Sequence, residues 1–427
     1  MLILLLSCAV DDGRIPLQYC EDPGLAREVS PVERPLTWHA DVAPIVTERC
    51  ARCHESAVAP FPLKAYDDVA SRAGVIEGTL LTGAMPQWSA DDCCGKAYRD
   101  DRSLTQEELD TVVGWLRQGA PEGDPSTAVS LPSLARPELP RVDAVAQMAE
   151  PYTPSPPADS TDDLRCFVID IPEAAKGRYV TGFDVKPGNL QVVHHVLVSA
   201  VARWDQAAFT QLDARDPGPG FECRGGEGAL GDRQVGAWVP GLEGLVLPEG
   251  LGIELPNDGK LILSLHYDLS AVDGQPTSDQ TLVELMLADE VERAVTPLPV
   301  MNPLWVFDRG MRIEGDSAET GYGFAWDPQL VYGPGREWDV WGVFVHMHEL
   351  GTTASVAILR GDEQECLLHI PYWDFDWQAN YWFDTPTRLS PGDRLYLECN
   401  WRNPYDTLAW GDDQEMCGAI VYGTKAE

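Results

Sequence analysis

The chain has 427 residues and a formal net charge of −37. This length is enough for about three domains, each able to bury its own core. The net negative charge repels nucleic acid and anionic membrane surfaces, so we expect no nucleic-acid partner. The simplest interpretation of this charge is a solvated acidic surface.

Residues 1–35 form an N-terminal export segment in this interpretation. Leu2–Leu6 is apolar, and Ser7 and Cys8 follow it, which resembles a lipobox that ends in a lipidated cysteine. The apolar run is short and has no basic residues before it, so we expect the start to be truncated or mis-called. A lipidated Cys8 would tether the chain to a membrane. No other segment has the roughly 18 apolar residues that span a bilayer.

Residues 36–123 contain a haem-attachment motif, Cys50-Ala51-Arg52-Cys53-His54. Positions i, i+3 and i+4 share a helix face, so both thiols can bond the haem vinyl groups while His54 reaches the iron. Met85, in a Met-Pro-x-Trp loop, is the predicted sixth ligand. The alternative for this motif alone is a zinc or redox site.

A helix is predicted after this loop, with Ser103 and Gln106 as its capping box and Gly119 as its stop. It resembles the last helix of class I cytochromes c. We therefore expect an N-terminal all-α cytochrome c domain over 36–123, with one covalently bound haem c.

A proline-rich linker is predicted over 124–160. Beyond it, short alternating apolar runs separated by glycine and proline turns indicate antiparallel β-sandwiches, and fourteen tryptophans help to fill them. These sandwiches divide into 161–290 and 291–427.

Five of the eight histidines of the chain form three small clusters in this β region: His194, His195, His266, His346 and His348. The first three make a predicted all-nitrogen metal site, called here the three-histidine site. Adjacent strand residues point to opposite faces, so His194 and His195 reach one metal only at a bulge or strand end, with one ring using Nδ1 and the other Nε2. The lone His39 and His369 are expected to be structural.

His346 and His348 lie two apart on a predicted strand and share a face. With the sulfur of Met416 they make a mixed site, called here the thioether site. A thioether is a soft donor that zinc seldom takes and cuprous copper accepts readily. The sequence therefore predicts two copper ions.

The order of these motifs resembles the copper type II, ascorbate-dependent monooxygenases, to which the peptidylglycine and dopamine hydroxylases belong. The likeness spans about residues 161–423 and rests on His-His, His-Tyr, His-x-His and Met-Cys in that order. It implies an electron-transfer copper at the three-histidine site and a catalytic, dioxygen-binding copper at His346, His348 and Met416. It also implies two jelly-roll-like copper domains facing each other across a solvent-filled gap, and a disulfide between Cys399 and Cys417.

The substrate contacts of the peptide-amidating enzymes are replaced. Phe344 stands where those enzymes have a carboxylate-binding arginine, and Gly418 and Ile420 stand where they have an asparagine and a tyrosine. Ser264 replaces a glutamine. A glycine-extended peptide is therefore not the expected substrate.

Together these features predict a copper-dependent monooxygenase that hydroxylates a C–H bond of a small molecule with dioxygen. Its electrons would pass through the haem from an external donor such as ascorbate, a quinol or another cytochrome. The alternative is a non-enzymatic haem and copper electron-transfer or copper-binding protein, which would have closed coordination and no substrate pocket.

Covalent haem attachment and eleven cysteines place the chain in the periplasm or another extracytoplasmic compartment, as an outer-membrane or cell-surface lipoprotein if Cys8 is lipidated. Cys166 and Cys223 flank the first histidine motif and are predicted to pair. The pairing of the others stays open: Cys20 could reach Cys93 or Cys94, and Cys366 is left over.

Overall fold

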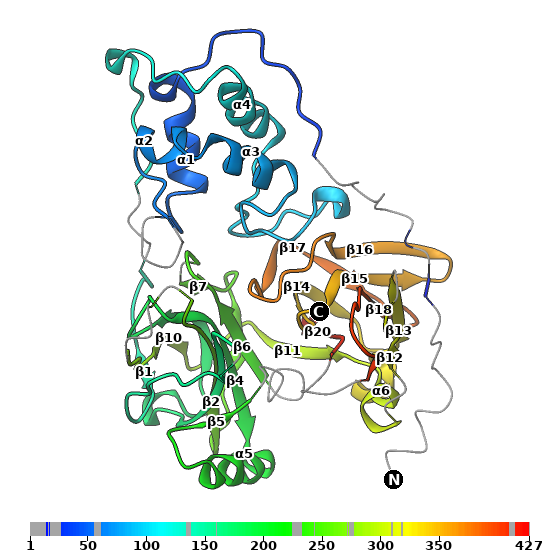
Figure 1. Cartoon of the computed structure of the whole chain (residues 1–427). Helices are drawn as coiled ribbons and strands as arrows, with labels where there is room; N and C mark the ends of the chain where they lie inside the picture. Colours follow the sequence, from blue (N-terminus) through cyan, green and yellow to red (C-terminus); the bar gives the residue numbers. More distant parts are fainter. Residues whose placement is uncertain are drawn as a thin grey trace. The chain divides into compact units, whose positions relative to one another are not determined.

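The computed structural model describes residues 14–15, 17, 27–54, 61–133, 138–158, 160–223, 233–242, 244–270, 272, 277–308, 311–316, 319–409 and 415–426. The chain divides into two compact units (Figure 1). The smaller unit is Asp22–Trp88 with Asp100–Pro137, and the larger unit is Met1–Glu21, Ser89–Arg99 and Glu138–Glu427. Cys8 and Cys20 lie outside the described residues, as does most of the predicted export segment.

The smaller unit has only short helices: α1 (Ala43–Arg49), α2 (Tyr66–Ala70), α3 (Ala73–Leu81) and α4 (Gln106–Arg117), with the helical turns η2 (Trp38–Val42) and η4 (Pro125–Thr127). Its core contains the fully buried Trp115 and Leu36. The capping box of α4 is Thr105 with Glu108, two residues beyond the predicted pair. Gly119 follows the helix with φ +88, as predicted for a stop.

The predicted fold class is wrong. No large all-α N-terminal domain occurs among the described residues, because the four α-helices of the smaller unit have between 5 and 12 residues. The predicted domain is also interrupted, since residues 89–99 belong to the larger unit. There Asp91 N–H donates to His369 O at 2.9 Å and Arg99 N–H donates to Trp382 O at 2.8 Å. These backbone hydrogen bonds hold residues 89–99 on the larger unit, which contains most of the chain.

The larger unit contains four sheets and the short helices α5 (Arg203–Arg215), α6 (Pro303–Asp308), α7 (Gln329–Tyr332), η3 (Asp92–Cys94) and η5 (Glu173–Ala175). The five-stranded sheet has the order β5 (Phe221–Glu222), β2 (Asp162–Asp170), β9 (Gly259–Asp268), β4 (Val193–Ala202) and β6 (Arg233–Trp238). The four-stranded sheet is β13 (Thr320–Trp326), β18 (Arg394–Trp401), β15 (Gly351–Arg360) and β16 (Glu363–Ile370). β12 (Arg312–Ile313) pairs with β19 (Leu408–Ala409).

The nine-stranded sheet runs through both predicted copper domains. Its order is β1 (Ala144–Gln147), β10 (Leu282–Ala288), β3 (Tyr179–Lys186), β8 (Leu251–Glu254), β11 (Arg293–Val300), β20 (Gly418–Lys425), β14 (Trp338–His346) and β17 (Tyr381–Leu389), with β7 (Leu245–Val246) paired to β3. β11 pairs in parallel with β8 and antiparallel with β20. The expectation of two separate sandwiches is therefore wrong, because one hydrogen-bonded sheet is shared by both halves.

The core of the first half lies between the five-stranded sheet and the β1–β8 part of the nine-stranded sheet. Leu263 and Val196 come from the first sheet, and Phe183 and Val283 come from the second; all are 3% exposed or less. Side chains in this layer alternate with outward ones along each strand, as two stacked sheets require. The close packing of these two sheets fixes the strands that carry the first histidines.

Three disulfides are present among the described residues. Cys166–Cys223 confirms the predicted pair, and Cys399–Cys417 is the pair that the resemblance implied. Cys94 pairs with Cys366, which the sequence had left open, and Cys93 is also disulfide-bonded. This cross-linking indicates an oxidising, extracellular type of compartment. Among the described helices, none is both long and apolar enough to cross a membrane.

A substitution at Gly236 tests how closely the five-stranded and nine-stranded sheets pack. A Cβ at this β6 position would lie 2.0 Å from Cζ of Phe183, which is buried in the facing sheet. We expect Gly236→Ala to lower the free energy of unfolding by about 1–3 kcal/mol through overpacking. The measurement is urea unfolding followed by tryptophan fluorescence.

The control is Gly78→Ala in α3, where nothing lies within 4 Å of the added Cβ. This change should raise stability by up to about 1 kcal/mol, because alanine has the higher helix propensity. Equal effects of the two substitutions would contradict the described contact between the sheets.

Candidate metal centres

A β-bulge places the first pair of histidines. β4 pairs with β9 so that Val193 faces Tyr267 and His195 faces His266, with a register shift between them at His194. The bulge confirms the predicted irregular strand. It turns the side chain of His194 toward the same side as that of His195, which simple strand alternation would not allow.

The three rings of the three-histidine site converge. Their centroids lie 4.9 Å (His195 to His266), 5.1 Å (His194 to His266) and 6.0 Å (His194 to His195) apart. One donor atom from each ring lies within 4.8 Å of the others. In each ring the buried Nδ1 has no hydrogen-bond partner among the described residues. These three Nδ1 atoms are therefore available to a metal, and the predicted use of one Nδ1 and one Nε2 by the adjacent pair stays a prediction.

Asp162, at the start of β2, orients His266. Nε2 of His266 donates to Oδ1 of Asp162 at 2.8 Å, which leaves Nδ1 unprotonated in the neutral ring. This hydrogen bond lowers the pKa of the Asp162 carboxyl. A carboxylate behind a histidine is the arrangement that fixes a metal ligand's tautomer and raises its basicity.

The other two rings are held neutral by their surroundings. Burial lowers the pKa of His194, and the neighbouring His266 lowers it further. The same two causes lower the pKa of the fully buried His195 well below its ordinary value. A neutral imidazole has the lone pair that a metal ligand requires, so His194 and His195 are in the chemical state that binds a metal.

The thioether site forms where β14 and β20 meet. His346, the last residue of β14, pairs with Gly418, the first residue of β20. Continuing this antiparallel register brings His348 opposite Met416. The rings of His346 and His348 lie 5.1 Å apart, and Met416 is 6% exposed. The strand pairing thus brings together two histidines and a methionine that are about seventy residues apart in the sequence.

Gln378 sets the tautomer of His346. Its Nε2 donates to Phe375 O at 3.0 Å, so its Oε1 is left to accept from Nδ1 of His346 at 2.7 Å. The buried Nε2 of His346 has no hydrogen-bond partner among the described residues. This nitrogen is therefore the one available to a metal.

Glu415 holds the backbone of the second histidine. Its carboxylate accepts from His348 N–H at 3.0 Å, from Leu350 N–H at 2.7 Å and from Trp401 Nε1 at 2.9 Å. Burial raises the pKa of Glu415 to about 7. The disulfide of Cys417 to Cys399 fixes the other side of Met416. The thioether site is thus built on a rigid frame.

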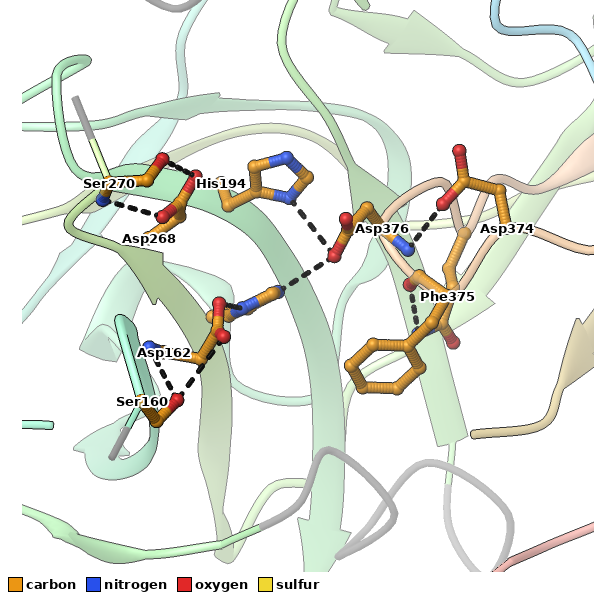
Figure 2. Close-up of polar contacts among 10 residues, drawn as sticks. Ser160, Asp162, His194, Asp268, Ser270, Asp374, Phe375 and Asp376 are labelled. Carbon is orange, nitrogen blue, oxygen red and sulfur yellow. Dashed lines mark hydrogen bonds and ion pairs between the residues drawn. The ribbon is translucent and has the colours of Figure 1, made fainter. Parts of the chain in front are cut away.

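One loop, residues 371–380 between β16 and β17, reaches both sites. The ring of Phe375 lies 6.0 Å from His195, 5.8 Å from His266 and 6.0 Å from His348, measured between centroids. Figure 2 shows Phe375 beside Asp376, whose carboxylate points toward His194. An aromatic side chain thus stands between the two histidine sites, where the resemblance implied a solvent-filled gap.

The haem motif lies at the end of α1, where Cys53 N–H and His54 N–H both donate to Cys50 O. Neither Cys50 nor Cys53 is in a disulfide. Burial raises the pKa of the Cys50 thiol to about 12, and the nearby Cys53 adds to this shift. Both residues therefore stand as thiols, the form that adds to a haem vinyl group.

His54 is oriented as an axial ligand would be. Its Nδ1 donates to Phe61 O at 2.9 Å, because a carbonyl can only accept, and this leaves the lone pair on Nε2. Burial lowers the pKa of His54. Met85 packs on the same helical core as Cys50. These residues fit a covalently attached haem.

The remaining histidines have other roles. His369 shares a hydrogen bond of 2.7 Å with Ser355, and His39 lies 3.7 Å from Glu122. Asp91, Cys93 and His369 also approach one another. The sulfur of Cys93 is already in a disulfide, so it is not available to a metal.

Four residues of the sites escaped sequence reasoning: Asp162, Phe375, Asp376 and Gln378. Asp162 belongs to an ordinary polar strand end and gave no signal. The other three lie in Trp373-Asp-Phe-Asp-Trp-Gln378, whose mixture of acidic and aromatic residues between two strands is unusual for a solvated loop. That composition was the one available signal.

Comparisons with known proteins add little. A scan against protein-family models finds no match, and a search of curated proteins finds no similar sequence. A solved structure that matches is the VP2 subviral particle of infectious bursal disease virus, at 8% identity and a TM-score of 0.18, over 67% of this chain and 72% of that chain. So low a TM-score carries no argument about fold or function. The three-histidine site and the thioether site therefore carry the functional interpretation of this chain.

The lowered histidine pKa values predict an acid-sensitive fold in the metal-free protein. A depressed pKa means that the folded state binds fewer protons than the unfolded state, so stability falls as pH drops below about 6.5. Urea unfolding in the presence of a chelator at pH 7.5 and 5.5 measures this loss. We expect His195→Gln to reduce the pH slope by up to about 1.4 kcal/mol per pH unit. An unchanged slope would mean that His195 is not held neutral.

Proposed function

We propose that this chain is a copper-dependent monooxygenase that hydroxylates a C–H bond of a small molecule with dioxygen. The observation that carries the proposal is the asymmetry of the two sites. One offers three imidazole nitrogens, and the other offers two imidazoles with the sulfur of Met416. This division of donors resembles that of the copper type II, ascorbate-dependent monooxygenases.

The residues fit copper on their own chemistry. The three unpartnered Nδ1 atoms and Nε2 of His346 are buried polar atoms, and each is costly to leave without a ligand. Hydrogen bonds from the opposite ring nitrogens orient His266 and His346. A thioether donor selects cuprous copper over zinc. When bound, copper would supply dioxygen reduction and the transfer of one oxygen atom to the substrate.

Other residues of the chain hold the ligands of the thioether site in place. Glu415 holds the His348 backbone, and the sheet register keeps Met416 beside it, so the donors of the thioether site keep their geometry with three protein ligands. Three ligands leave a position for an exogenous molecule, as catalytic metal sites generally do. Phe375 places an apolar ring beside histidines of both sites.

The substrate is proposed to be other than a glycine-extended peptide. Phe344 and Ile420, which stand where the peptide-amidating enzymes contact their substrate, are 0% and 1% exposed in β14 and β20. Ser264 is 6% exposed and approaches the sulfur of Cys166 at 3.1 Å. None of the three presents a charged group to a peptide carboxylate.

Electrons are proposed to enter through a covalent haem held by Cys50, Cys53, His54 and Met85. The support is that these two cysteines are thiols in a chain whose other described cysteines are disulfide-bonded, and that His54 keeps Nε2 for iron. The external donor would be ascorbate, a quinol or another cytochrome. Covalent haem assembly and the disulfides support a periplasmic location, with Cys8 as the proposed lipid tether.

A second candidate function is electron transfer without a substrate. The position of Phe375 favours it, because one ring spans the space between the two sites and leaves the centres close together. Reactivity toward dioxygen separates the two functions, since only the oxygenase requires it.

The reaction with dioxygen tests the oxygenase. Metal-loaded protein is reduced anaerobically and then mixed with dioxygen, while haem and copper spectra are followed together. We expect haem and copper to reoxidise together in the wild type, and at least about ten-fold more slowly in Met416→Leu, because the soft donor that favours cuprous copper is lost.

Met347→Leu is the matched control. Met347 is fully buried between the two histidines, and its methyl group packs against Gly351. The same substitution there should leave reoxidation unchanged. Copper that binds in the wild type but ignores dioxygen would favour electron transfer without a substrate.

The redox potential of the haem tests whether Met85 is its sixth ligand. Methionine opposite histidine raises the potential of a haem, so Met85→His should lower the midpoint potential by on the order of 0.1 V. Redox titration of the haem band measures it. A His54→Ala variant should lose the axial histidine and change the spectrum even before reduction. If Met85→His leaves the potential unchanged, another residue is the sixth ligand.

A further inference from the structure

A carboxylate faces the three-histidine site from loop 371–380. Asp376 places its Oδ1 3.7 Å from Nδ1 of His266 and 4.0 Å from Nδ1 of His194 (Figure 2). These two nitrogens are buried and have no hydrogen-bond partner among the described residues. The carboxylate is therefore directed at the same atoms that would bind the metal.

The distances distinguish between two explanations. Separations of 3.7 and 4.0 Å are too long for N–H···O hydrogen bonds, which end at about 3.2 Å. Two ligands on one ion with bonds of about 2.1 Å can lie up to about 4.2 Å apart. Both separations fall within that limit. Oδ1 of Asp376 can therefore share one ion with these two nitrogens, and it is not hydrogen-bonded to either of them.

The Asp376 side chain is 50% exposed and could be hydrated on its open side. Its backbone is nevertheless fixed, because Asp376 N–H donates to Oδ1 of Asp374 at 3.0 Å and the His195 ring bonds to the Asp376 backbone.

We propose that Asp376 is the fourth ligand of the three-histidine site, which makes it a closed four-coordinate site for a divalent ion, Cu²⁺ or Zn²⁺. This inference rests on the proposed function, which supplies the metal. It adds a ligand that sets which oxidation state of the ion the three-histidine site prefers. Four protein ligands are typical of a closed site that holds its ion without taking up substrate.

The carboxylate gives the two sites opposite preferences. A hard, anionic oxygen donor stabilises a divalent ion, whereas the neutral sulfur of Met416 stabilises cuprous copper. Asp162 and Asp268 add negative charge near the same histidines. The three-histidine site is therefore biased toward the oxidised ion, and the thioether site toward the reduced one.

The ligand also ties the loop to the metal. Asp376 lies next to Phe375, which contacts both sites, and two residues before Gln378, which orients His346. An ion held by β4, β9 and Asp376 thus fixes the loop that sets the geometry of the thioether site.

The test compares Asp376→Asn with Asp374→Asn in the full chain. Both changes remove one negative charge from the same loop, but only Asp376 faces the Nδ1 atoms, and asparagine at 374 keeps the oxygen that accepts from Asp376 N–H. Metal-free protein is titrated with Zn²⁺ and, separately, with Cu⁺ against competing chelators. The Cu²⁺-loaded forms are compared by electron paramagnetic resonance.

We expect Asp376→Asn to weaken Zn²⁺ binding by at least about ten-fold and to change the Cu²⁺ spectrum, with Cu⁺ binding altered less than about three-fold. Asp374→Asn should stay within about three-fold for both ions. Equal effects of the two variants would overturn the assignment of Asp376, whatever the activity. Wild-type protein that binds Zn²⁺ and copper but never reacts with dioxygen would instead overturn the proposed function and leave the Asp376 ligand in place.

Discussion

The pairing of β11 with both β8 and β20 is the constraint on which the larger unit depends. Because β11 is hydrogen-bonded in parallel to one half and antiparallel to the other, the two halves share one sheet. Backbone ladders leave little freedom for the halves to separate as independent domains would. The strands that carry the two histidine sites are therefore held in one framework, and a single side chain can contact both sites.

The bridging loop 371–380 makes use of that framework. It presents Phe375 to both sites, Asp376 to the three-histidine site and Gln378 to the thioether site. Hydrogen bonds within the loop, such as Gln378 Nε2 to Phe375 O, keep these groups in fixed relation.

The chemistry of the sites follows from burial and outer hydrogen bonds more than from the histidines themselves. Burial lowers the pKa of His195 and His346, which keeps their lone pairs free for a metal. Asp162 and Gln378 then choose which ring nitrogen faces the site. A soft sulfur at one site and the proposed carboxylate at the other would give the two ions different preferred charges.

The sequence by itself determined the irregular strand at His194 and His195, the disulfide of Cys166 with Cys223 and the end of α4 before Gly119, because spacing and local backbone preference set these features. It did not determine that β8 and β11 join the halves, since strand partners far apart in the chain leave no local pattern. The expected all-α domain was wrong because the helices of the smaller unit are short and residues 89–99 are hydrogen-bonded to distant β-strands. Only the tertiary structure decided that Asp162, Phe375, Asp376 and Gln378 surround the histidines, because their positions depend on how the strands beside them pack.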